Sequence, residues 1–459
     1  MSNVDSVATA SALRHALSRD GTANLIDAEL GALLPASDVR ADATDFARRL
    51  GDLGVRHEQK VIPVDPRPFV ITRPAFTALA DRFARLFVLL ELAIDRYLDD
   101  PEVRRFFALA PRHDRLVRLG ARHRPRIRYC RYDFTLAPDG RPRIYELNTH
   151  CPASATYGTH FATLLRDSRG YAALGKAGLR SARFALEEPG SFAAAMLAAA
   201  DDANHPVRTV AVLNSRHLTM TTELDHIAGQ FRSLGRTAVR CHVEDLRYDG
   251  RRLHLDGLPV DLTYNKFDDS HGPDAFECAF SRTEQEVRDY VRAYRDGAVF
   301  TVNSFPSMYL PEQKSMLAFL HSPLFRAGLT AADRDLVDEI VPETVVVRHA
   351  DDDQLRRFGA DRGRYVLKRS LDTRGRSLVI GRSVPAGDWE RALLRARSAE
   401  AGDDWVVQEL APPLVSTTRP ADGGPARTVH TSLACFLFAD RPVGLIVRTS
   451  VEETTNVGR

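Results

Sequence analysis

The spacing of apolar residues changes along the chain, and each change predicts a different kind of structure. Residues 1–120 are predicted to be mostly helical, because apolar positions recur at helical spacing in "FTALADRFARLFVLLELAIDRYL". From "RPRIRYCRYDFTLAP" the period shortens to two, which is typical of a half-buried strand. Helical sequence returns after the small-residue loop "NTHCPASATYGTH". We therefore expect an N-terminal helical region, 1–120, and a hairpin-bearing part, 121–205.

Strands and helices alternate in the next segment, 206–300. There "RTVAVLNS", "TTELDHIAGQFRSLG" and "TAVRCHVEDL" predict a strand, a helix and a strand, so we expect a parallel-sheet unit with a site at its strand ends. The segment 301–459 begins with helical sequence. Six apolar runs from "IVPETVVV" to "VGLIVRT" then predict an antiparallel-rich α+β module from about residue 330. The expected fold class is mixed α/β and α+β.

Composition narrows the classes of partner. The formal net charge of the 459 residues is +2, so no global field would attract nucleic acid or an anionic membrane. The five cysteines include no C-x-x-C pair, and no secretory or transmembrane run is present. These features predict a soluble cytoplasmic protein without nucleic-acid or membrane partners, and they are compatible with a homodimer.

Lysine is rare in this chain. Only five of the 63 basic residues are lysine, at positions 60, 176, 266, 314 and 368. The lysine ammonium is compact and rotatable, whereas the arginine guanidinium is a rigid fork. Each lysine of this chain is therefore either a candidate phosphate contact or a surface residue without a special role.

The stretch "RYDFTLAPDGRPRIYELN" places four polar side chains on a predicted hairpin. With the turn at Asp139-Gly140, the register pairs Asp133 with Glu146 and Arg131 with Asn148. The period-two rule then puts these four on one face. The opposite face is predicted to carry Tyr132, Phe134, Tyr145 and Leu147.

Directly opposed carboxylates repel each other, so this pairing needs a compensating charge. A hard divalent cation is one solution, because Mg²⁺ takes carboxylate and amide oxygens together with substrate phosphates. The alternative is an exposed edge hairpin whose arginine pairs with the acids in solvent. The hairpin alone leaves both interpretations open.

A second group of residues is compatible with nucleotide binding. No P-loop or dinucleotide fingerprint is present. Lys368 ends an apolar strand beside the glycine-containing loop "DTRGRS", where it could reach phosphates. The segment "DWVVQELAPP" ends a buried strand and could offer backbone groups to adenine, while Lys314 enters a helix in "YLPEQKSMLAFL".

In this order, the motifs resemble the circularly permuted ATP-grasp carboxylate–amine ligases, in particular the synthetase domain of glutathionylspermidine synthase. The resemblance covers residues from about 120 to the end. It implies an ATP-grasp fold with a pre-ATP-grasp α/β domain at 206–300 and a nucleotide-binding part at 301–459. The "DTRGRS" loop is less glycine-rich than the family pattern.

The resemblance also implies roles for individual residues. Asp133, Glu146 and Asn148 match the Mg²⁺ ligands, and Arg131 matches the arginine that stabilises the reacting groups. The implied ATP contacts are Lys314, Lys368, Arg374, Gly375, Gln408, Glu409 and Leu410. The implied substrate contacts are Lys266, Ser154 and Thr156.

The implied reaction uses ATP and Mg²⁺ to join a carboxylate, from an amino acid or peptide, to an amine through an acylphosphate, releasing ADP and phosphate. The loops "DTRGRS" and "RPADGGPAR" are candidate lids. Two alternatives stay open: a small-molecule kinase that stops at the phosphorylated product, and a nucleotide-binding regulatory protein without turnover.

Overall fold

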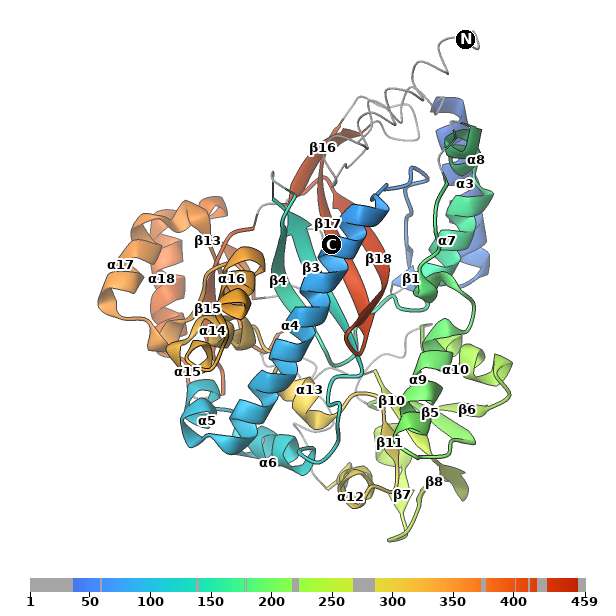
Figure 1. Cartoon of the computed structure of the whole chain (residues 1–459), viewed down its shortest axis with the longest axis horizontal. Helices are drawn as coiled ribbons and strands as arrows, with labels where there is room; N and C mark the ends of the chain where they lie inside the picture. Colours follow the sequence, from blue (N-terminus) through green and yellow to red (C-terminus); the bar gives the residue numbers. More distant parts are fainter. Residues whose placement is uncertain are drawn as a thin grey trace.

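The computed structural model contains three main sheets surrounded by helices (Figure 1). Two of these sheets are antiparallel and the third is parallel. The mixed α and β class expected from the sequence is therefore confirmed. The structure describes residues 36–57, 60–137, 140–176, 178, 180–216, 223–266, 285–372, 377–400, 402–411, 413–418 and 427–452.

The first antiparallel sheet contains the hairpin. Strand β17 pairs with β3 of the hairpin and with both β16 and β18. The C-terminal strands β16, β17 and β18 therefore belong to the same sheet as the hairpin, although about 280 residues separate β16 from β3 in the sequence. The single module expected from about residue 330 is instead divided between two sheets. The five strands are β3 (Tyr129–Leu136), β4 (Pro142–Asn148), β16 (Leu414–Thr418), β17 (Arg427–Phe438) and β18 (Arg441–Ser450).

One face of this sheet is covered by the long helix α4 (Arg73–Asp99), which runs across it in Figure 1. The ring of Phe83 on α4 contacts the rings of Tyr132 and Phe134 edge to face, with centroids 5.5 and 5.1 Å apart. Burying these aromatics supplies much of the core. The opposite face of β3 is thereby left for the polar residues.

The second antiparallel sheet follows the order β12-β15-β13-β14. Helices α17 and α18 pack on it, with Trp389 buried among them. Its strands are β12 (Thr344–Val346), β13 (Tyr365–Arg369), β14 (Val379–Ile380) and β15 (Trp405–Glu409). The helices of this region are α14 (Ser315–His321), α15 (Pro323–Arg326), α16 (Ala331–Ile340), α17 (Asp352–Ala360) and α18 (Ala386–Arg397).

The third sheet is parallel, as the alternating pattern predicts, and its strand order is β11-β10-β5-β6. Every residue of β5 is buried, so neither face of this strand is exposed to solvent. The main elements are β5 (Thr209–Asn214), β6 (Thr237–His242), β10 (Leu262–Asn265), β11 (Phe300–Thr301), α9 (Ser191–Asp202), α10 (Glu223–Ser233), α12 (Arg288–Asp296) and α13 (Phe305–Tyr309). A small sheet beside it contains β7 (Arg247–Tyr248), β8 (Leu253–Leu255) and β9 (Leu258–Val260).

The part of the first 120 residues that the structure describes is mainly helical, as expected. Helix α4 begins after Thr72, whose side chain caps the Ala75 N–H, and its buried residues recur at helical spacing. The other elements of this region are α3 (Ala36–Asp52), β1 (Arg56–His57), β2 (Lys60–Val61), α5 (Pro101–Phe107) and α6 (Pro111–Leu119). Helices α7 (Tyr157–Asp167) and α8 (Arg169–Lys176) follow the hairpin.

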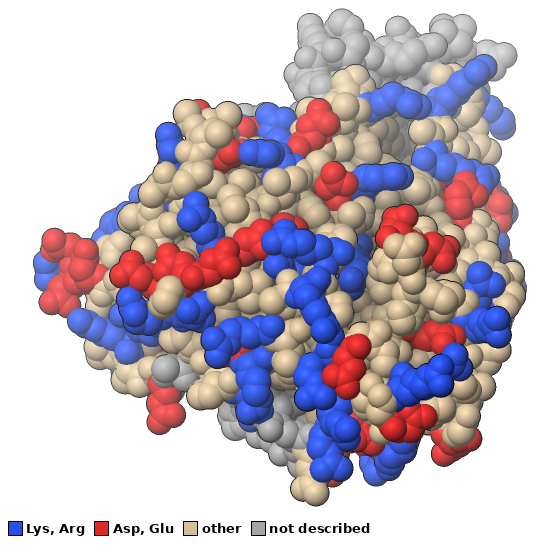
Figure 2. All heavy atoms as spheres, turned by 60° about the horizontal axis from the view of Figure 1, so that its bottom comes forward, with Lys and Arg blue, Asp and Glu red and all other residues tan. Residues whose placement is uncertain are grey.

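Charges of both signs are interspersed on the face shown in Figure 2. This distribution matches the small formal net charge of +2. Within the described residues, no helix combines the length and the apolar character needed to cross a bilayer.

Candidate functional site

The hairpin pairs Asp133 with Glu146 and Arg131 with Asn148, as predicted. The register shifts by one residue beyond Asp133, because Phe134 pairs with Ile144. The strand pairs from Phe134 to Leu136 are therefore one residue out of the expected register, and a β-bulge at Tyr145 restores the predicted pairing from Asp133 to Arg131.

The bulge places Tyr145 on the site side of the sheet, which corrects the prediction that it lies with Tyr132 and Phe134. Its ring centroid is 5.3 Å from the Lys368 ammonium. Its hydroxyl is hydrogen-bonded to Ser432 on β17. A strict period of two cannot anticipate this position, because a bulge reverses the alternation by inserting one residue.

Asp133 is held between two arginines. Arg131 donates to both of its carboxylate oxygens, at 2.7 and 2.9 Å, and Arg448 on β18 lies 2.8 Å from Oδ2. Asp133 is only 1% exposed. Burial would raise the pKa of this carboxyl, but the two guanidinium groups outweigh it and hold the pKa below its ordinary value. Arg448 is a site residue that the sequence motif did not reveal.

Glu146 contacts the second antiparallel region through Lys314. The Lys314 ammonium lies 3.0 Å from Glu146 Oε1 and donates to the Asp372 carbonyl at 2.7 Å. Lys314 immediately precedes α14, as predicted, and its backbone N–H donates to the Ser370 carbonyl. The repulsion between Asp133 and Glu146 is thus balanced in this structure by basic side chains.

Lys368 approaches the hairpin from β13. Its ammonium donates to Gln408 Oε1 at 2.7 Å and to the Tyr145 carbonyl at 3.2 Å. The pKa of Lys368 is lowered to about 8, chiefly by burial; Glu146 and Asp133 oppose this shift, and the nearby Lys314 adds to it. The two predicted phosphate lysines therefore meet at the same edge of the hairpin.

The predicted adenine segment is only partly available for a ligand. The Gln408 side chain is buried between Lys368 and Thr344, where Nε2 donates to Thr344 Oγ1. The backbone N–H groups of Glu409 and Leu410 already donate to the carbonyls of Glu343 and Arg364. Arg374 and Gly375 lie outside the described residues, as do most of the two predicted lid loops.

The loop at 149–156, which follows Asn148, is fixed at several points. Glu312 Oε2 accepts the backbone N–H groups of Thr149 and His150, at 2.5 and 2.8 Å. Arg131 Nη1 donates to the Ala153 carbonyl at 3.0 Å. Glu312 was not singled out from the sequence, although it lies two positions before Lys314.

The predicted substrate residues lie on or beside this loop. Lys266 donates to the Cys151 carbonyl at 2.8 Å and pairs with Glu223 at 3.2 Å. Ser154 adopts a left-handed backbone with φ of 74°, and Thr156 is buried. These residues are therefore connected to the hairpin through the loop backbone.

Two of the three predicted Mg²⁺ ligands on the hairpin are suitably placed to bind a hard cation. Glu146 and Asn148 supply a carboxylate and an amide from the same face of β4, and the buried Asn148 Nδ2 has no hydrogen-bond partner among the described residues. Glu146 is the accessible carboxylate, with its side chain 29% exposed. Asp133 is fully engaged by arginines, so direct ligation by it would require one of those contacts to open. No three His, Cys, Asp or Glu side chains in the described ranges form a metal-binding group.

No protein-family model matches this sequence, and no curated protein is found to be similar to it.

Proposed function

We propose that this protein is an ATP-dependent carboxylate–amine ligase of the ATP-grasp type, with ATP and Mg²⁺ bound between the two antiparallel sheets. The observation that carries the proposal is the meeting of Lys314 and Lys368 with the hairpin. Lys314 lies 3.0 Å from Glu146, and Lys368 reaches the carbonyl of Tyr145. Ammonium groups beside a carboxylate–amide face are suited to hold a metal-bound polyphosphate.

The proposed reaction has two steps. An oxygen of the substrate carboxylate attacks the γ-phosphorus of ATP, the bond to the β-phosphate oxygen breaks, and ADP leaves. The amine then attacks the acyl carbon of the acylphosphate, phosphate departs with the bonding electron pair, and the nitrogen loses a proton. Positioning and charge neutralisation supply most of the catalysis in this chemistry.

The residues have distinct parts in this scheme. Lys314 and Lys368 orient the phosphates, and Arg131 stands beside them with a guanidinium fixed by Asp133 and by the Ala153 carbonyl. Such a preorganised cation stabilises charge that develops on the transferred phosphoryl group. Glu146 and Asn148 are the proposed ligands for Mg²⁺, which supplies neutralisation of the phosphate charge when bound.

The test is a screen for phosphate and ADP release over pairs of carboxylates and amines, comparing the wild type with Glu146→Gln. The substitution keeps the size of a partly exposed side chain and removes the charge, so we expect release to fall by about a hundredfold or more. Glu102→Gln is a matched control, because Glu102 is an exposed glutamate in a surface pair on α5.

The outcomes separate the alternatives. Release that requires both a carboxylate and an amine supports the ligase. Release with one substrate, accompanied by a stable phosphorylated product, supports a kinase instead. ATP binding without release in any mixture supports a regulatory protein, and equal rates for wild type and Glu146→Gln contradict the metal assignment.

A further inference from the structure

A buried polar cluster lies where the parallel sheet meets the hairpin sheet. It contains Tyr264 on β10, Lys266 directly after β10, Glu223 at the start of α10 and Tyr129 at the start of β3. The rings of Tyr129 and Tyr264 both pack edge to face on Phe192, with centroids 5.1 and 5.3 Å from its own. In α/β proteins, ligands bind outside the carboxyl ends of parallel strands, and the cluster lies at this end of β10.

Three polar atoms of this cluster have no hydrogen-bond partner among the residues that the structure describes. They are the hydroxyls of Tyr129 and Tyr264 and the Oε1 atom of Glu223. The two tyrosines are 0% exposed and Glu223 is 4% exposed. Buried polar groups are nearly always paired, because an unpaired one costs free energy. Three such atoms in one cluster indicate that a bound group supplies their partners.

The members of the cluster act on one another electrostatically. Burial raises the pKa of Tyr129 well above its ordinary value; Tyr264 and Glu223 add to this shift, and Arg131 opposes it. Burial, followed by Glu223, likewise raises the pKa of Tyr264. Both hydroxyls are therefore protonated at neutral pH and can donate hydrogen bonds. The cluster thus extends from Glu223 to the proposed catalytic Arg131.

Lys266 and Glu223 give the cluster one charge of each sign. Lys266 Nζ lies 3.2 Å from Glu223 Oε2, and the side chains are 10% and 5% exposed. This contact uses only one carboxylate oxygen, so Oε1 is left as an acceptor. The cluster therefore offers two hydroxyl donors and one carboxylate acceptor beside an ion pair whose charges cancel.

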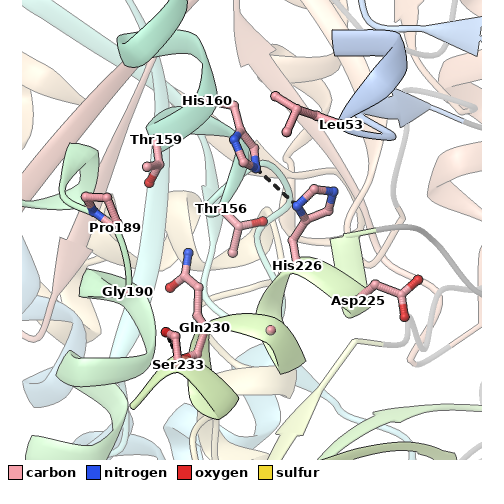
Figure 3. Close-up of a pocket in the computed structure, with 11 residues that line it drawn as sticks. Leu53, Thr156, Thr159, His160, Pro189, Gly190, Asp225, His226, Gln230 and Ser233 are labelled. Atoms are coloured by element: carbon pink, nitrogen blue, oxygen red, sulfur yellow. Dashed lines mark hydrogen bonds between the residues drawn. The ribbon is translucent and has the colours of Figure 1, made fainter. Parts of the chain in front are cut away.

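A cavity of about 470 Å³ lies farther along α10, between this helix, α7 and the start of α9 (Figure 3). Thr156, the last residue of the 149–156 loop, lines it, so the loop ends at this cavity. Its two histidines, His160 and His226, are 3.1 Å apart, and burial lowers the pKa of both, so the rings are neutral at neutral pH. Lysine and arginine are absent from its described lining. A ligand with charged groups is therefore matched by the cluster and not by the cavity.

We propose that the cluster binds an α-amino acid in its zwitterionic form. The ammonium of the amino acid donates to Oε1 of Glu223, and its carboxylate accepts hydrogen bonds from the hydroxyls of Tyr129 and Tyr264. Because the zwitterion has no net charge, it satisfies the three atoms without adding an uncompensated charge to a buried site. This inference rests on the proposed ligase function for its role: the amino acid is the carboxylate substrate, held with its carboxylate on the Arg131 side of the cluster.

The 149–156 loop gives the amino acid access to the cluster. Lys266 donates to the Cys151 carbonyl at 2.8 Å, and Arg131 donates to the Ala153 carbonyl at 3.0 Å. The loop is therefore tied to both ends of the cluster by side-chain donors. Release of these two contacts lets the loop move aside while Glu312 still holds its first two residues.

Tyr264→Phe is the most direct test, because it removes only a hydroxyl that has no partner among the described residues. In a purely structural cluster this change leaves stability unchanged or raises it, whereas a ligand site loses affinity. Tyr294→Phe is the matched control. Tyr294 is also buried, but it lies on α12, where its ring packs against Phe305 and His123.

Gly229→Leu tests whether the ligand lies in the cavity instead. Gly229 lines the cavity on α10, and a Cβ added there meets no atom within 4 Å. The leucine therefore takes up cavity space without a clash at the helix. Replacing a helical glycine in this way should preserve or raise stability.

Binding is screened by the rise in Tm with each proteinogenic L-amino acid, with and without Mg²⁺ and a non-hydrolysable ATP analogue. The best ligand is then measured by calorimetry against its N-acetyl derivative, which lacks the ammonium, and its amide, which lacks the carboxylate. We expect each derivative to bind about tenfold or more weakly. Tyr264→Phe should weaken binding of the amino acid about fivefold, whereas Tyr294→Phe and Gly229→Leu should leave it unchanged. Glu223→Gln should reduce the preference for the amino acid over its N-acetyl derivative about tenfold.

Three results would overturn the proposal: no binding of any amino acid at millimolar concentration, equal binding of the amino acid and its derivatives, or unchanged binding in Tyr264→Phe. Loss of binding in Gly229→Leu would place the ligand in the cavity and would also overturn it. The ligase proposal fails separately. If the amino acid binds and Tyr264→Phe weakens it while no substrate mixture releases ADP, the amino-acid site stands and the ligase does not. If amine-dependent ADP release is as fast with carboxylates that lack an amino group, and is unchanged in Tyr264→Phe, the ligase stands and the amino-acid site fails.

Discussion

The Lys314 ammonium lies 3.0 Å from Oε1 of Glu146 and joins the start of α14 to the hairpin strand β4. The contact is partly buried, with side-chain exposures of 11% for Lys314 and 29% for Glu146. It links the two antiparallel regions at the edge where Lys368 also approaches. The proposed nucleotide site depends on this meeting.

Lys314→Met should weaken ATP binding by about tenfold, because it removes one of two cations placed for the phosphates. Stability should change by no more than about 1 kcal/mol, since the side chain keeps its apolar stem and the pair is not fully buried. Calorimetric titration with ATP measures the first effect and urea unfolding the second. Lys60→Met is the control, as Lys60 is exposed, and equal losses in both variants would contradict the phosphate role.

Lys368 should make stability depend on pH above neutrality. Burial holds its folded pKa near 8, below the ordinary value of 10.5, so the unfolded chain binds more protons between these values. The free energy of unfolding should therefore rise with pH across that window, by up to about 3 kcal/mol relative to a variant without the group.

The measurement is urea unfolding of the wild type and Lys368→Met from pH about 7 to about 10. Other titrating groups are common to both proteins, so the difference between the two curves isolates Lys368. A difference that stays constant over this range would show that the pKa is not lowered.

Asp133 and Arg448 should be strongly coupled. Asp133→Asn leaves two partly buried guanidinium groups without their charge partner in the sheet, so we expect a loss of about 3 kcal/mol. A double-mutant cycle with Arg448→Met should give a larger coupling energy than the exposed pair Asp353 and Arg356.

The pH dependence gives a second measure of Asp133. Because its folded pKa lies below the ordinary 3.8, its stabilising contribution is present above that value and lost as pH falls through the folded pKa. Acid unfolding should therefore begin at a higher pH in Asp133→Asn. Coincident acid transitions would contradict the ion-pair cluster.

Glu312 should act by positioning the loop after Asn148. Glu312→Ala removes the acceptor of two backbone N–H groups and should destabilise the protein by about 2 to 3 kcal/mol. Glu312→Gln retains an oxygen acceptor and should recover most of this loss. If the loop orients the substrates, Glu312→Ala should also raise the KM for substrate more than that for ATP, and equal changes in both would favour a purely structural role.

The hairpin shows what local sequence can and cannot predict. Apolar and polar residues in "RYDFTLAPDGRPRIYELN" place Asp133 opposite Glu146 correctly, since both lie beyond the bulge from the turn, where the expected register is restored. Tyr145 is placed on the wrong face, because the bulge that moves it depends on how β4 fits β3 and the neighbouring sheet. Arg448 is missed because its contact with Asp133 depends on β18 reaching the hairpin sheet through β17.

The sequence by itself determined the helical N-terminal layer, the parallel α/β unit, the pairing of Asp133 with Glu146 and of Arg131 with Asn148, and the position of Lys314 at a helix start. These features follow from periodicity and turn residues, which act over short distances along the chain. Tertiary structure decided which sheet the C-terminal strands join, which basic groups neutralise Asp133 and Glu146, and that the 149–156 loop ends at a cavity. Those outcomes depend on contacts between residues far apart in the sequence, where burial and charge pairing, not local pattern, select the partner.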